Sequence, residues 1–222
     1  PSLVFTPSII NDSRRLIINN LPLSFLCQNR AENVDFQTLM KDNDANEINF
    51  STILRMNASF PYVMPTTSLP TEPAIEVFDS GLKDNFGIKT TASYIYELRD
   101  WLSKNPSGIV ILQISDGLKR KKVLKGESQG LTQTLLNPFG SLYKNLFEVQ
   151  QYNNDELLSL LKESYKGEMT LYRYELNKSD ENYISLSWHL QTKEKEQILN
   201  SISLTSNQET EKQLKSLLNS KP

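Results

Sequence analysis

Short apolar runs separated by polar turns dominate the first half of the chain. Residues 1–20, "PSLVFTPSIINDSRRLIINN", hold two apolar runs around a turn at 11–13, which predicts a β-hairpin. The run "AIEVF" at 74–78 predicts a short strand that leads into Asp79. The continuous apolar run "GIVILQIS" at 108–115 is typical of a strand buried on both faces in a parallel sheet.

Helical spacing of apolar residues marks most of the remaining elements. Residues 88–104 place apolar side chains three or four positions apart, which predicts an amphipathic helix. With its flanking strands, this helix makes 74–115 a strand–helix–strand unit, for which a right-handed crossover is expected. A further strand is predicted in "EMTLYRYEL", because it alternates apolar and polar residues. Further helices are predicted at 49–57, 141–165, 192–203 and 207–219.

The amino-acid composition constrains the possible function of the chain more than it constrains the fold. The chain has 222 residues with 24 Lys+Arg against 26 Asp+Glu, so its charge gives no reason to expect nucleic acid as a partner. The chain has a single cysteine, which excludes an intrachain disulfide. Together with its single histidine, this counts against a four-ligand zinc site. The chain opens on Pro1 and enters a strand-like run at once, so we expect a piece of a longer protein.

A hydrolase motif occurs in "GESQG" at 126–130, which matches G-x-S-x-G around Ser128. Asp155 or Asp180 and then His189 follow in the order of a Ser-Asp-His hydrolase. Such a serine must stand between a buried strand and a helix, whereas five of the ten residues before it are Lys or Arg. We therefore favour a chance match and a structural role for the histidine, and keep an α/β-hydrolase as the alternative.

A more specific set of motifs lies between residues 55 and 88. It consists of R-x-x-A-S-x-P at 55–61, a strand that enters D-S-G at 79–81, and D-N-x-G-I at 84–88. This ordered set resembles the C-terminal catalytic region of the patatin-like phospholipase family, and the similarity extends over most of the chain. The resemblance implies a three-layer α/β/α fold, of which this chain is the C-terminal portion.

The resemblance also implies a domain organisation and an activity. Residues 1–115 would form the C-terminal half of the catalytic core, and residues 116–222 a helix-rich extension packed on the same domain. In the family, the aspartate of this turn, here Asp79, is one half of a Ser-Asp dyad. The implied reaction is hydrolysis of carboxylic esters of phospholipids or lysophospholipids through an acyl-serine, in a bacterial enzyme without metal or organic cofactor.

The family's serine and its glycine-rich oxyanion loop precede the aspartate strand. We therefore expect the nucleophile in a missing N-terminal half of the same protein, and this chain alone to be inactive. The expected partners are that half, a lipid ester, and a membrane surface that is reached through parts outside this chain. The third hypothesis is a patatin-like scaffold that has lost its catalytic activity and binds a lipid or a protein.

Physical chemistry also favours Asp79 without the family. A carboxylate after a buried strand, in a glycine-bearing loop, stands where α/β sheets place active sites, and it can activate a serine without a histidine. The competing interpretation is that Asp79 only hydrogen-bonds its own turn. Asp84 is a second candidate carboxylate, for which a turn or helix-cap role is favoured.

Three further residues belong to the predicted active-site loop. Ser80 stands where the family usually has glycine, so we expect a slightly remodelled turn. Gly81 completes the turn. Arg55 has two open readings, since it either orients the loop by pairing with a carboxylate or is a solvated surface arginine.

Overall fold

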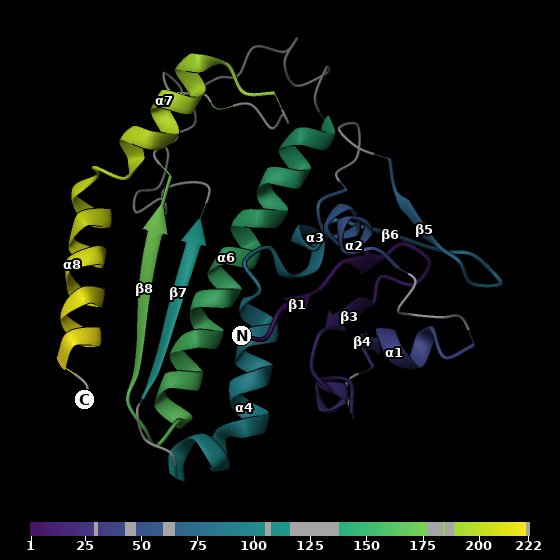
Figure 1. The fold of residues 1–222 in the computed structure, drawn as a ribbon, viewed down its shortest axis with the longest axis horizontal. Coiled ribbons are helices and arrows are strands. Elements are labelled where there is room, and N and C mark those ends of the chain that lie inside the picture. The colour runs from purple at the N-terminus through teal and green to yellow at the C-terminus, as the bar shows by residue number, and fades with distance from the viewer. Residues whose placement is uncertain are drawn as a thin grey trace. The chain divides into compact units, whose positions relative to one another are not determined.

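The computed structural model describes residues 1–28, 31–42, 48–59, 65–104, 108–115, 138–176, 184 and 189–220. Helices and strands are mixed along these residues, which agrees with the α/β class, whereas the three-layer arrangement stays a prediction (Figure 1). The chain divides into two compact units. Unit 1 comprises Pro1–Pro106 with Leu136–Lys166, and unit 2 comprises Ser107–Leu135 with Gly167–Pro222. The division at 115 that the resemblance implies stays a prediction.

Unit 1 is built on a curled, mainly antiparallel sheet. Strand β3 pairs antiparallel with β1 and β2 in one continuous register, so the predicted hairpin is confirmed. Strand β2 pairs antiparallel with β6, β6 pairs antiparallel with β5, and β4 joins β3 in parallel. The strands are β1 (Val4–Phe5), β2 (Ser8–Ile9), β3 (Arg15–Asn19), β4 (Asn33–Asp35), β5 (Thr67–Leu69) and β6 (Ile75–Phe78).

The core of unit 1 consists of two buried clusters, and the larger one forms on one face of this sheet. Met56 of helix α2 (Phe50–Asn57) and Phe36 of helix α1 (Phe36–Leu39) pack there against strand residues. A short 3-10 helix, η1 (Ser24–Leu26), adds Leu26 to a second buried cluster. The strand side chains of the first cluster are Ile9, Leu16, Ile18, Leu69 and Val77.

Three more helices of unit 1 position the site described below. They are α3 (Gly81–Asp84), α4 (Ile88–Lys104) and α6 (Pro138–Ser164). Helix α4 has the bounds predicted from its apolar spacing, and it buries Ile88, Ala92 and Ile95 as that spacing requires. Helix α6 packs against both α3 and α4.

The described part of unit 2 contains two parallel strands and two helices. Strand β7 (Ile109–Ser115) pairs with β8 (Met169–Glu175) over seven residue pairs. Helix α8 (Thr205–Ser220) packs along β8, where the Asn207 side chain bonds both the N–H and the C=O of Glu175. Helix α7 (Thr192–Ser201) precedes it. The strand and the two terminal helices predicted in this region are confirmed.

Two predictions about residues 108–115 are wrong. Among the described residues, β6 pairs with β2 and β5 whereas β7 pairs with β8, so the two strands do not form one βαβ unit. Strand β7 is also not buried on both faces, since its side chains alternate between buried and exposed positions. A continuous apolar run shows that a strand is hydrophobic but does not show which element it packs against. It therefore cannot distinguish a strand covered on one face from a strand covered on both. The exposed side chains are Val110, Leu112 and Ile114.

Candidate active site

Asp79 lies immediately after β6, where the strand turns into helix α3. Its backbone N–H donates to the C=O of Ser59 at 2.9 Å. Its carboxylate Oδ1 accepts the N–H of Gly81 at 2.5 Å, whereas Oδ2 accepts no hydrogen bond from the described part of the chain. The side chain is thus held by one oxygen, and the other oxygen is available to a proton donor.

The surroundings of Asp79 make its carboxylate a stronger base than that of an ordinary aspartate. Burial of the side chain raises its pKa, and the hydrogen bond from the Gly81 N–H offsets only part of this shift. A carboxylate with a raised pKa accepts a proton more readily, which suits a general base.

Gly81 allows the close approach of this carboxylate to the backbone. A Cβ on Gly81 would lie 2.6 Å from Asp79 Oδ1, 3.0 Å from Asn85 Oδ1 and 3.4 Å from Phe147 Cε1. Any side chain would therefore push the carboxylate away from the N–H that holds it. The predicted place of this glycine in the loop has a steric explanation.

Ser80 has an ordinary backbone conformation. Its backbone angles, φ −65° and ψ −26°, are right-handed helical and are accessible to any residue. The remodelling expected from a serine at this position stays a prediction. The Ser80 carbonyl accepts the N–H groups of Lys83 and Asp84 and begins α3.

Arg55 contributes through its backbone. Its side chain is exposed on α2, and its guanidinium pairs with no carboxylate in the part of the chain that the structure describes. Its carbonyl accepts the hydroxyl of Ser59 at 2.5 Å, and the carbonyl of Ser59, which is 1% exposed, holds the Asp79 N–H. The geometry favours the interpretation that Arg55 is a solvated surface arginine. The R-x-x-A-S-x-P motif contacts Asp79 through Ser59.

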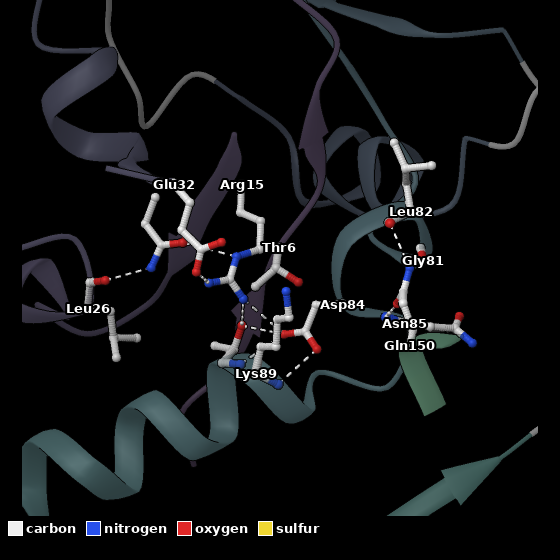
Figure 2. Close-up of polar contacts among 12 residues, drawn as sticks. Thr6, Arg15, Leu26, Glu32, Gly81, Leu82, Asp84, Asn85, Lys89 and Gln150 are labelled. Carbon is white, nitrogen blue, oxygen red and sulfur yellow. Dashed lines mark hydrogen bonds and ion pairs between the residues drawn. The ribbon is translucent and has the colours of Figure 1, made fainter. Parts of the chain in front are cut away.

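Asp84 caps helix α4, as predicted. Its Oδ1 accepts the N–H of Lys89 at 3.0 Å, and its Oδ2 accepts the N–H and the hydroxyl of Thr90 at 2.9 and 2.7 Å. The guanidinium of Arg15 lies 3.3 Å from the same oxygen and also pairs with Glu32 at 2.8 Å (Figure 2). Asp84 and Arg15 are each 1% exposed, so this carboxylate is enclosed and fully engaged.

Gln150 of helix α6 also contacts the loop that follows Asp79, and sequence reasoning did not identify it. Its Nε2 donates to the carbonyls of Gly81 and Leu82 at 3.0 and 2.7 Å, and its Oε1 accepts the N–H of Asn85 at 3.2 Å (Figure 2). No local pattern singles this glutamine out, because all its partners lie at least 65 residues away.

An open groove of about 620 Å³ lies between α4 and α6 in the same unit. Its surface is mainly apolar, although Lys89 and Glu32 also line it. A volume of this size is within the range of small-molecule sites. The other lining side chains include Ala92, Ser93 and Tyr96 of α4 and Leu157, Leu160 and Leu161 of α6.

The alternative Ser-Asp-His set extends beyond the described residues and stays an alternative prediction. Ser128 and Asp180 lie outside the described residues. Asp155 is on helix α6 of unit 1, and His189 is exposed in unit 2. The described ranges hold no group of three or more His, Cys, Asp or Glu residues able to bind a metal ion. No helix in those ranges has the length and apolar character needed to cross a membrane.

Comparison of the chain with models of protein families, with curated protein sequences and with solved structures gives no match.

Proposed function

We propose that this chain is the aspartate-bearing part of a serine acyl hydrolase that cleaves carboxylic esters of phospholipids or lysophospholipids. The observation that carries the proposal is Asp79, which is held at the end of a sheet strand by one oxygen and has its second oxygen unoccupied. The patatin-like arrangement of three layers is part of the same proposal, and its support is the ordered motif set around this aspartate.

In the proposed reaction, a serine hydroxyl donates its hydrogen bond to Asp79 Oδ2. The serine Oγ attacks the ester carbonyl while its proton passes to the carboxylate, and the alcohol leaves after it takes up a proton. Water then hydrolyses the acyl-serine with Asp79 again accepting a proton. The raised pKa of Asp79 favours these transfers. The serine and the amides that stabilise the oxyanion would lie outside these 222 residues.

The proposal that the substrate is a lipid rests on a separate observation. The groove between α4 and α6 lies in the unit that carries Asp79, although none of its lining residues belongs to the Asp79 loop, and its mainly apolar surface favours a ligand with a hydrocarbon part. Contact with a membrane surface would follow from such a substrate.

Labelling with a fluorophosphonate probe tests the proposal. The probe is applied to this chain and to the complete gene product that contains it, and the labelled serine is located by peptide mapping. We expect a label on a serine outside residues 1–222 and none on the chain alone. A label on Ser128 would overturn the proposal in favour of the α/β-hydrolase, and no label on either protein would favour a binding scaffold.

A further inference from the structure

We infer that Gln150 is a positioning residue, through which helix α6 holds Asp79 in the orientation that a base requires. The inference rests on the proposed function, and it names a residue of α6 that acts on the reacting carboxylate through the loop backbone.

The contacts of Gln150 all go to the backbone of the loop that follows Asp79. One amide group donates to two successive carbonyls, of Gly81 and Leu82, and accepts the N–H of Asn85. The side chain thereby fixes peptide groups at both ends of the short helix α3. A four-residue helix has too few internal hydrogen bonds to be stable alone, so these external contacts decide its geometry.

The contacts reach Asp79 through Gly81. The residue whose carbonyl accepts from Gln150 is the one whose N–H donates to Asp79 Oδ1. That N–H is the only hydrogen-bond donor to the Asp79 carboxylate in the described part of the chain. A change in the orientation of Gly81 therefore directly changes the hydrogen bond that positions the Asp79 carboxylate.

Other residues fix the two ends of this loop but not its middle. The Asp79 N–H is bound to Ser59, and Asp84 is held by Arg15 and the start of α4. Loss of the Gln150 contacts should therefore leave unit 1 folded and loosen only the segment around Gly81. This separates a positioning role from a general contribution to folding.

The test is an NMR pH titration of the Gly81 amide proton in the 222-residue chain. Since this proton is bonded to the carboxylate, its chemical shift should follow the ionisation of Asp79. The variant Gln150→Met keeps the length of the side chain but removes its hydrogen bonds. We expect it to lose most of the titration amplitude and to lower the protection of the Gly81 amide from hydrogen exchange by about tenfold.

Gln151→Met is the matched control, because the side chain of this neighbouring glutamine makes no hydrogen bond in the described part of the chain. It should leave the Gly81 titration unchanged. An unchanged titration in Gln150→Met would overturn the inference. Equal losses in both variants would also overturn it, because they would indicate a general loosening of α6.

Activity of the complete gene product separates this inference from the proposed function. If Asp79→Asn abolishes ester hydrolysis and Gln150→Met leaves it unchanged, the function stands and the positioning role is wrong. If Gln150→Met abolishes the Gly81 titration but Asp79→Asn leaves hydrolysis intact, the contact is confirmed and the proposed function is overturned. A reduced rate in Gln150→Met with an altered pH profile supports both.

Discussion

Asp79 precedes helix α3 and Asp84, five residues later, is its last residue, and their surroundings differ in kind. The carboxylate of Asp84 accepts three hydrogen bonds from the first turn of α4 and pairs with a buried arginine. The carboxylate of Asp79 accepts one hydrogen bond, from Gly81, and faces no cation among the described residues. Two acids of one loop therefore have different capacities for chemistry.

A carboxylate has lone pairs for about four hydrogen bonds, and their use distinguishes a structural acid from a reactive one. Those of Asp84 are engaged, so it can neither accept a further proton donor nor leave its place without breaking a helix cap. Asp79 keeps Oδ2 unoccupied, and burial raises its pKa. A loop can thus hold a reactive aspartate in place because a neighbouring aspartate anchors it.

The largest expected effect comes from breaking the anchor. Arg15→Ala leaves Asp84 buried without its cation, which should lower the free energy of unfolding by about 3–5 kcal/mol. Arg14→Ala is the control, because the adjacent arginine pairs with Asp12 on the exposed surface and should cost no more than about 0.5 kcal/mol. Urea unfolding of both variants measures the difference. Equal losses would contradict a structural role for the Asp84 network.

Gly81→Ala should produce the next largest effect. Its Cβ would meet Asp79 Oδ1 at 2.6 Å, so we expect a loss of about 1–3 kcal/mol and a displaced carboxylate. The Gly81 amide, now of alanine, should no longer titrate with Asp79 in NMR. Gly87→Ala is the control: it is strained by a φ of 66° but meets nothing within 4 Å, so it should cost stability without moving Asp79. If both variants leave the Asp79 signal unchanged, the steric argument is wrong.

Asp79 itself should reduce stability at neutral pH. Its pKa is raised in the folded chain from the usual value of 3.8, so the folded state favours the protonated form. The contribution of Asp79 to stability is therefore fully present below pH 3.8 and is lost as the pH rises through the raised pKa. Asp79→Asn should gain less than about 1 kcal/mol at pH 7, because the side chain is partly exposed, and should gain almost nothing in acid.

Urea unfolding of Asp79→Asn between pH 3 and pH 7 measures this effect. Glu76→Gln, a change of an exposed acid on the same strand, provides the reference. A loss of stability at pH 7 in Asp79→Asn would mean that the ionised carboxylate stabilises the loop and has a structural role like that of Asp84.

Ser80→Gly should have the smallest effect. The backbone of Ser80 is ordinary for any residue and its side chain makes no capping bond, so we expect a change of a few tenths of a kcal/mol. The titration of Asp79 should be unchanged. A clear shift in that titration would show that the family's glycine matters here for a reason other than backbone conformation.

Local pattern predicted much of this molecule, and long-range contacts account for what it missed. The apolar spacing of 88–104 located helix α4, and the polar residues after "AIEVF" located both aspartates, because these features depend on neighbours in sequence. Arg15 and Gln150 could not be assigned, since their partners lie up to 75 residues away. The partner of β7 could not be assigned for the same reason, because an apolar strand pairs equally well with several others.

The rate of ester hydrolysis by the complete gene product carrying Asp79→Asn tests the central claim most directly, with Glu76→Gln as the matched control. Because a positioned base contributes roughly 10²–10⁴ to a rate, Asp79→Asn should lower hydrolysis of a lysophospholipid by about that factor. Glu76→Gln should leave the rate unchanged. Hydrolysis by Asp79→Asn at the rate of the unaltered protein would contradict the assignment of Asp79 as the base.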